Sequence, residues 1–300
     1  MIKHASVISV GICCSLLSGC VGSSAVDDFA MASTQAASLF PAVAAIPYDV
    51  CVADQQNQQL AAVTDFDVKF EFDQSKIDSN CKAAEATSQR LQKTYTVLAT
   101  YISALGKLAG GNVPTYDTNI TTLVATTPGL TLSQQTAVSG LASLVADMID
   151  KGYRQKEAAK AIEKAQPWVQ QLTGMLKDQL PALLNQYLSN EIDSRGSLYR
   201  GIYVFRFKGT ELHTSAVLVT KDFMEDRTQI ENARNAVAAF EKIFVSIGEG
   251  HTILYNNRNK LWDKNVLQQV FQSASSIEKQ VTAVDGDACR APVATGAKEK

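Results

Sequence analysis

The cysteines are the residues of this 300-residue chain best suited to covalent chemistry, and there are six of them. A thiol can be acylated, oxidised to a disulfide, used as a nucleophile or bound to a metal. Cys20 closes the run Leu17-Ser18-Gly19-Cys20, directly after an apolar stretch over residues 5–17. Small residues after a short apolar stretch are typical of a cleaved N-terminal segment. Modification of the Cys20 thiol is therefore the chemistry that the sequence indicates most clearly.

Leu17-Ser18-Gly19-Cys20 resembles the lipobox of bacterial lipoproteins. The resemblance implies that a signal peptidase cleaves before Cys20 and that its thiol carries acyl chains, which anchor the protein in a membrane. The apolar stretch of about thirteen residues is shorter than the ~20 residues of a spanning helix. Val21, in place of the Asp that retains enterobacterial lipoproteins in the inner membrane, implies the outer membrane. We therefore expect a signal peptide over 1–19 and a lipidated tether over 20–26, with an ordinary secretory signal as the alternative.

Cleavage would leave three thiols besides Cys20, at Cys51, Cys81 and Cys289. The bacterial envelope outside the cytoplasm is oxidising, so one intramolecular disulfide is expected. Three pairings are possible, and we favour Cys51–Cys81 because these two cysteines bracket one compact segment. There is no Cys-x-x-Cys motif, and His213 and His251 are the only histidines after the leader. We therefore expect neither thiol catalysis, nor a metal site, nor a cofactor.

Composition argues against nucleic acid as a partner. The chain has 28 basic and 30 acidic residues and a net charge of -2, without a polybasic stretch. Hydrophobic residues make up 46% of the sequence, which is enough for one large core or two modest ones. Only 7 prolines and 17 glycines interrupt it, so long helices are favoured.

Apolar residues recur at steps of three and four over five stretches, which predicts helices that each turn one face to a core. We expect the paired glycines at 110 and 111 to end one helix, and Gly248 with Gly250 to end another. Pro41 is expected to end the first helix, Pro167 to begin one, and Pro181 to kink it. The apolar stripes are Leu91, Tyr95, Leu98, Ile102, Leu105 and Ala109; Val138, Leu141, Val145 and Met148; Val169, Leu172, Leu176, Leu180, Leu183 and Tyr187; Ile230, Ala233, Val237, Phe240, Phe244 and Ile247; and Leu267, Val270, Ala274, Ile277 and Val281.

Two segments have the pattern of strands. Residues 65–73 alternate polar and apolar residues without exception, and residues 201–220 hold two runs rich in aromatic and β-branched residues around a glycine. We therefore predict a mainly α fold: an elongated bundle of long antiparallel helices with a small antiparallel sheet, made from the strand at 65–73 and a hairpin at 201–220. One domain is expected over 27–283, followed by a disordered tail over 284–300.

The stretch from Thr94 to Ala146 carries only two formal charges, on Lys107 and Asp117. One interpretation is a helical hairpin whose small residues allow close packing. The other is a surface that loses little hydration when it meets a partner or a membrane. The tongue-like segment at 201–220, between two helices, also resembles helical pore-forming toxins loosely, although Arg206, Lys208 and Glu211 make it more charged than the tongue of those proteins.

The sequence is poor in enzymatic motifs. Gly-x-Ser-x-Gly, the phosphate-binding glycine loop and His-Glu-x-x-His are all absent. Acid–base pairs can be imagined at Glu191 with Asp193 or at Glu225 with Asp226, but neighbouring acids on a helix are usually just solvated. We therefore expect a non-enzymatic lipoprotein of the bacterial envelope that binds an envelope protein partner. A membrane-active protein and an enzyme with an unrecognised site are the alternatives.

Overall fold

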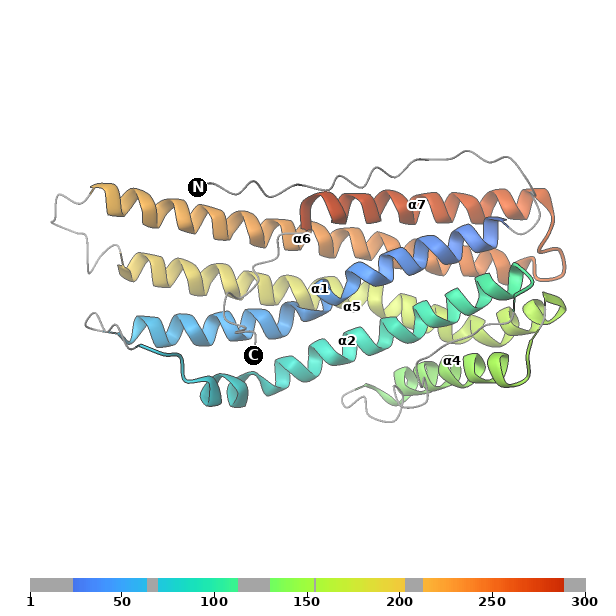
Figure 1. Ribbon diagram of the computed structural model, residues 1–300, viewed down its shortest axis with the longest axis horizontal. Helices are drawn as coiled ribbons and strands as arrows, with labels where there is room; N and C mark the ends of the chain where they lie inside the picture. Colours follow the sequence, from blue (N-terminus) through green and yellow to red (C-terminus); the bar gives the residue numbers. More distant parts are fainter. Residues whose placement is uncertain (1–23, 64–69, 113–129, 154, 203–212, 289–300) are drawn as a thin grey trace, which may run out of the picture.

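The computed structural model is an elongated helical bundle, and it describes residues 24–63, 70–112, 130–153, 155–202 and 213–288. Its elements in chain order are α1 (Ser24–Ala61), α2 (Gln74–Ala109), α4 (Leu132–Asp150), the short 3₁₀ helix η1 (Gln155–Glu157), α5 (Ala158–Ile202), α6 (His213–Asn256) and α7 (Lys264–Ala288). The long helices α1, α2, α5 and α6 lie along the same axis and alternate in direction (Figure 1).

The two ends of the bundle differ in what they bring together. At the end that we call proximal, α1 begins, and α2, α4 and α6 end (Figure 1). At the opposite, distal end, α1 and α5 finish and α6 starts. The shorter helices α4 and α7 cover the proximal part, so the distal part consists of the four long helices (Figure 1).

Helix α1 lies at the centre of the packing, because α2, α5, α6 and α7 all contact it. Its Phe40 ring meets Tyr95 of α2 and Phe240 and Phe244 of α6 edge-on, at centroid distances of 4.5, 5.1 and 5.8 Å. Such edge-to-face contacts add ~0.5–1.5 kcal/mol each beyond the area that they bury. This aromatic cluster joins three helices in the middle of one continuous apolar core.

The predicted apolar stripes are confirmed almost residue by residue. All members of the stripes in α2 and α4 are buried, and in α6 and α7 only Ala233 and Val281 are partly exposed. In α5 the stripe is right as far as Leu180. Beyond it, Leu184 and Leu188 are buried in place of Leu183 and Tyr187, which lie at the edge of the core.

Glycines have two different roles in this bundle. Gly110 and Gly111 end α2 as predicted, and Gly111 has a φ of +79°, which suits glycine. The prediction that Gly248 and Gly250 end a helix is wrong, since α6 continues to Asn256. A Cβ on Gly250 would lie 2.5 Å from the Phe29 ring, so this glycine lets α1 and α6 approach closely.

The prolines also do not mark helix boundaries. Helix α1 continues through Pro41 and Pro47, and α5 continues through Pro167 and Pro181, so the predicted boundaries at Pro41 and Pro167 are wrong. An interior proline costs about 3 kcal/mol because it removes a hydrogen bond and crowds the preceding turn. Burial of the apolar residues around each proline offsets this cost.

The predicted sheet is absent from the described residues. The second arm of the hairpin is wrong, because α6 begins at His213, and α5 includes the first residues of the other arm. In the segment at 65–73, the described residues 70–73 form no strand, and Asp73 instead caps α2 by accepting a hydrogen bond from the Lys76 backbone N–H (3.0 Å). β-propensity is weak against the cooperative extension of a long packed helix.

Several predictions lie wholly or partly outside the described residues. These are the signal peptide at 1–19, Cys20, Cys289, and the segments 64–69, 113–129 and 203–212. Residues 24–26 of the predicted tether belong to α1, and Val26 is already in the core. Residues 284–288 of the predicted tail belong to α7, which extends to Ala288, and the rest of that segment lies outside the described residues.

Small residues in the charge-poor stretch bring helices together, which agrees with the close-packing interpretation. A Cβ on Gly106 of α2 would lie 2.3 Å from the Cβ of Ala30 in α1, and one on Gly140 of α4 would lie 2.3 Å from the Trp168 ring of α5. Trp168 is partly buried in this contact. The sequence feature that suggested a binding surface is therefore, in its described part, a packing feature.

We predict that Gly106→Ala lowers the free energy of unfolding by about 1–3 kcal/mol, because the added methyl group overlaps Ala30 and forces α1 and α2 apart. Urea unfolding followed by circular dichroism measures this change. Gly174→Ala is the matched control, since a Cβ there meets no atom within 4 Å. That variant should be as stable as the wild type or more so. Equal effects of the two substitutions would contradict the close approach.

Candidate functional site

A disulfide joins α1 and α2 in the distal half of the bundle. It pairs Cys51 with Cys81, with an S–S distance of 2.08 Å and Cα atoms 5.7 Å apart, so the favoured pairing is confirmed. Beyond the disulfide, the Asn80 amide donates to Gln55. These links hold the two helices together where their buried apolar contacts become fewer.

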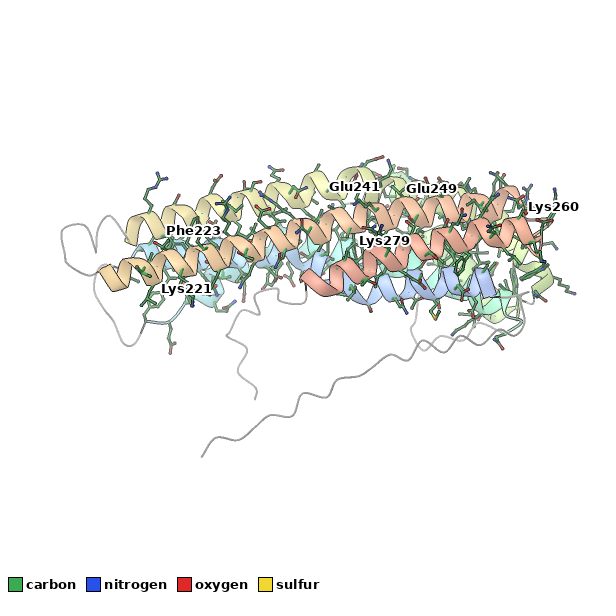
Figure 2. The ribbon with its side chains drawn as sticks, turned by 90° about the horizontal axis from the view of Figure 1, so that it is seen from above. Lys221, Phe223, Glu241, Glu249, Lys260 and Lys279 are labelled. Carbon is green, nitrogen blue, oxygen red and sulfur yellow. A yellow bond between two sulfur atoms is a disulfide. The ribbon has the colours of Figure 1, made fainter. Side chains whose placement is uncertain are left out.

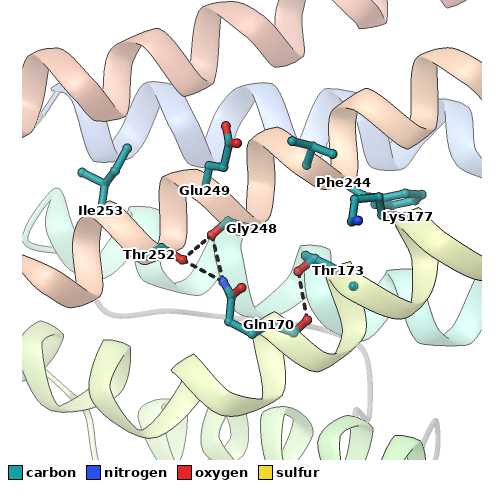
Figure 3. A pocket seen from close by; sticks show the side chains of 10 residues that line it. Gln170, Thr173, Lys177, Phe244, Gly248, Glu249, Thr252 and Ile253 are labelled. Atoms are coloured by element: carbon teal, nitrogen blue, oxygen red, sulfur yellow. Dashed lines mark hydrogen bonds between the residues drawn. The ribbon is translucent and has the colours of Figure 1, made fainter.

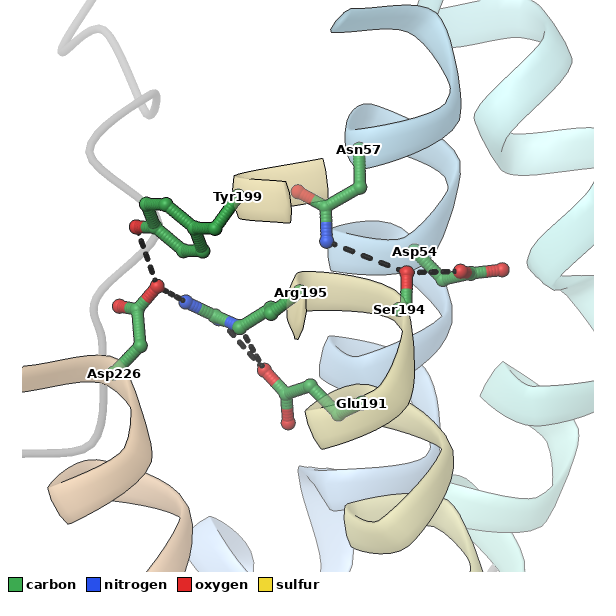
Figure 4. Close-up of polar contacts among 7 residues, drawn as sticks. All are labelled: Asp54, Asn57, Glu191, Ser194, Arg195, Tyr199 and Asp226. Carbon is green, nitrogen blue, oxygen red and sulfur yellow. Dashed lines mark hydrogen bonds and ion pairs between the residues drawn. The ribbon is translucent and has the colours of Figure 1, made fainter. Parts of the chain in front are cut away.

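The strongest polar cluster lies where α5 meets α6 near the distal end (Figure 4). Arg195 of α5 donates from Nε and Nη2 to Oε1 of Glu191, one turn earlier, at 2.9 and 2.6 Å. Its Nη1 lies 2.6 Å from Oδ2 of Asp226 in α6, and the Tyr199 hydroxyl donates to the same oxygen at 2.9 Å. The side chains of Arg195, Glu191 and Asp226 are only 16%, 9% and 20% exposed. One guanidinium therefore joins two carboxylates from different helices.

Burial and charge act against each other in this cluster. Burial alone would lower the pKa of Arg195, but Glu191 and Asp226 raise it above its usual value, so the guanidinium stays charged. Burial, together with the hydrogen bond to Asp226, raises the pKa of Tyr199, which keeps its hydroxyl as the donor. Burial and the nearby Glu191 also raise the pKa of Asp49 in α1.

Helix α1 joins the same region through Ser194. The Ser194 hydroxyl donates to Oδ1 of Asp54 at 2.6 Å, and the Asn57 amide lies 3.5 Å from the Ser194 oxygen (Figure 4). Polar contacts therefore link α1, α5 and α6 in the distal part.

Large apolar side chains are exposed at the distal end. In α6, Val217, Leu218 and Met224 are 66%, 55% and 52% exposed, and Leu60 and Phe72 near the α1–α2 connection are 41% and 39% exposed. Large apolar side chains are also exposed elsewhere in the described residues, at Met31, Leu132, Trp262 and Phe271, so exposure alone does not distinguish the distal end. We call the three side chains on α6 the distal apolar patch.

A shallow groove of about 610 Å³ runs between α5 and α6 in the proximal half (Figure 3). The Gln170 amide lies across it and donates to the Gly248 carbonyl and to the Thr252 hydroxyl, both at 2.9 Å. Lys177 and Glu249 also line the groove. Because Gln170 is used in joining the two helices, the groove offers few free polar groups to a ligand.

His251 of α6 is completely buried between α2 and α5. Its Nε2 lies 2.8 Å from the Tyr101 hydroxyl, and its Nδ1 lies 2.7 Å from Oε1 of Gln166. Burial lowers the pKa of His251 to about 3, so the ring is neutral at ordinary pH. Both ring nitrogens have partners, which indicates a structural role in joining three helices.

The acids that the sequence suggested as catalytic pairs are arranged differently in the bundle. Glu191 and Asp226 meet at Arg195, whereas Asp193 is exposed and Glu225 pairs with Lys221. Arg195 is not among the residues that the sequence suggested, although its spacing of four from Glu191 is the usual signal of an ion pair within a helix. No local signal indicates Asp226 as the partner in α6.

Among the residues that the structure describes, no group of three or more His, Cys, Asp or Glu side chains could hold a metal ion. Within the same residues, α1 is long and apolar enough to cross a membrane by length and composition alone. Four helices contact α1 in the bundle, which accounts for its apolar composition. A comparison with protein families, curated proteins and solved structures finds no match to this chain.

We predict that Asp226→Asn lowers the free energy of unfolding by about 1–3 kcal/mol, because it leaves part of the Arg195 charge uncompensated in a mostly buried place. Urea unfolding measures the loss. The matched control is Glu225→Gln at the residue next to Asp226. It removes the exposed ion pair of Glu225 with Lys221. That change should cost less than about 0.5 kcal/mol, and a cost equal to that of Asp226→Asn would contradict the importance of the buried pair.

We predict that His251 makes the fold sensitive to acid. Its pKa is about 3 in the fold against the ordinary 6.5, so below pH 6.5 the unfolded chain takes up a proton that the folded chain does not. The His251 contribution to the free energy of unfolding should therefore fall by up to about 1.4 kcal/mol per pH unit towards pH 3.

Unfolding by urea at pH 7 and pH 5 measures this effect. The stability of a His251→Gln variant should fall less between the two pH values than that of the wild type, whatever its stability at pH 7. Equal losses in the two proteins would show that His251 does not couple to acid unfolding.

Proposed function

We propose that this protein is a lipid-anchored scaffold of the bacterial envelope that presents the distal end of its bundle to an envelope protein. The anchor would be acyl chains on Cys20, and the compartment would be the outer membrane, as the lipobox resemblance and Val21 imply. The role is binding and positioning, without catalysis.

The observation that carries this proposal is the direction of the bundle. Helix α1 begins four residues after Cys20, at the proximal end, and the distal apolar patch lies at the opposite end (Figure 1). Helix α6 has 44 residues, which at 1.5 Å per residue corresponds to about 66 Å. A lipid on Cys20 would thus keep the proximal end at the membrane and allow the patch to reach a partner far from it.

The location of the disulfide also supports the proposal. An oxidising compartment allows Cys51–Cys81 to form, whereas the cytoplasm keeps most thiols reduced. A leader that exports the chain and a disulfide in the mature region are therefore consistent with each other. The distal apolar patch adds a surface whose burial by a partner would be favourable.

The anchor is tested by fractionating cells of the native host. We expect the wild type to remain with the outer membrane, to incorporate labelled palmitate and to resist extraction by salt and high pH. Cys20→Ser should leave the precursor unprocessed and unlabelled, because the thiol that accepts lipid is gone. Cys14→Ser in the leader is the matched control and should behave as the wild type. Mature wild-type protein with an unmodified Cys20 would contradict the proposal.

The partner surface is tested by site-specific photo-crosslinking in intact cells. A photoreactive phenylalanine analogue at Leu218 in the distal patch should give a discrete adduct with an envelope protein. The same analogue at Phe271 of α7, which is 51% exposed in the proximal half, is the matched control. Adducts at 271 but not at 218 would contradict a distal binding surface. Dye release from vesicles by the purified protein would favour membrane activity over the scaffold.

A further inference from the structure

The first part of α6 lacks the cover that the rest of this helix has. Helix α7 has 25 residues and α6 has 44. Lys221 and Phe223 of α6 lie beyond the end of α7 (Figure 2). Between residues 217 and 229 no described side chain is buried, and Ile230 is the first buried one among the described side chains of α6. This part of α6 therefore rests on α5 by a narrow stripe of half-buried side chains.

The facing part of α5 is weak as a helix. Between residues 192 and 201 no described side chain is buried. Gly196 and Gly201 fall in this part, and a Cβ at either position would meet no atom within 4 Å. Packing therefore does not require glycine there, and each glycine lowers the helix propensity substantially relative to alanine. The two glycines therefore make this end of α5 easier to unfold, although the packing would allow alanine at both positions.

Several contacts that close the two helices on each other can break separately. They include the pair of Arg195 with Asp226, the hydrogen bond of Tyr199 to Asp226, and the edge-on contact of the Tyr199 and Phe223 rings at 5.5 Å. Arg195 also bonds Glu191 within α5. When both segments lose helical order, Arg195, Glu191 and Asp226 become hydrated together, and the Ser194 bond to Asp54 of α1 breaks as well. Opening thus leaves no isolated buried charge. The cost of such a charge is the usual reason that buried ion pairs do not break.

We propose that residues 191–202 of α5 and 213–229 of α6 form a unit that opens locally, with Arg195 and Asp226 as its latch, and that opening exposes apolar side chains for the partner. The rest of the bundle stays folded, because its aromatic cluster and the disulfide lie outside this unit. In the open form, Phe223 and Tyr199 join the distal apolar patch. The partner in this inference is that of the proposed function, but the opening itself needs no partner.

The energetic basis is local unfolding. Parts of a protein with few buried apolar contacts open more often than its core, and a ligand that binds the open form shifts the equilibrium towards it. No proline or glycine lies in α6 between His213 and Ile247, so a hinge within this helix is not indicated. Opening therefore occurs by loss of helical order in the two segments.

Hydrogen exchange of the full-length protein in detergent, followed by mass spectrometry, tests the proposal without any partner. Amides of 191–202 and 217–229 should exchange at least about a hundredfold faster than those of 98–108 and 237–247, and the two distal segments should show similar protection. Gly196→Ala combined with Gly201→Ala should slow distal exchange by about tenfold or more, because both alanines favour the helix. Gly174→Ala, in the covered part of α5, should leave distal exchange unchanged.

The latch is tested in the same experiment. Asp226→Asn should accelerate exchange of both distal segments by about tenfold and leave the core unchanged, whereas Glu225→Gln should change neither. The proposal is overturned if the distal segments are as protected as the core, or if the alanine pair does not slow their exchange. The glycine variants keep the test decisive even if Asp226→Asn does not fold. If hydrogen exchange shows the local opening but crosslinking at Leu218 gives no adduct, only the proposed partner is rejected, and the opening stands.

Discussion

The packing of α1 against four other helices is the constraint on which the rest of this bundle depends. The helix carries apolar side chains around most of its first part, and a helix of that kind must be covered on several sides. Phe40 meets α2 and α6 through aromatic contacts, and Phe29 lies against a glycine of α6. Because helices from the first and the last parts of the chain cover α1, residues far apart in sequence contribute to a single core.

This covering explains features that are unusual in single helices. Prolines persist inside α1 and α5 because the surrounding side chains are buried, and glycines persist inside α2 and α6 because neighbouring helices approach them closely. The buried His251 follows the same logic. Its two hydrogen bonds give both ring nitrogens a partner where α2, α5 and α6 converge. The ring can therefore remain in the interior without an unsatisfied donor or acceptor.

The same core also explains the contrast between the two ends. On the distal side of α4 and α7, buried apolar side chains become fewer. Charged and hydroxyl side chains add contacts between the helices there. Polar contacts of this kind are specific in geometry but contribute modestly to stability, since each replaces a contact with water. The local opening that we propose lies at the distal end, and the lipid anchor that we propose lies at the proximal end.

The sequence by itself determined the helical class and the apolar stripes of α2, α4, α6 and α7 and most of that of α5, because periodicity is a local property of the chain, and it left Cys51–Cys81 as one of three possible pairings. Leu98, Val145 and Phe240 could be assigned to the core in this way. Only the tertiary structure decided that Gly250 lies inside a helix, that His213 begins one in place of a strand, and that Arg195 meets Asp226. These outcomes depend on which surfaces face each other, and burial against a neighbouring helix outweighs the local preference of a proline, a glycine or a β-branched residue.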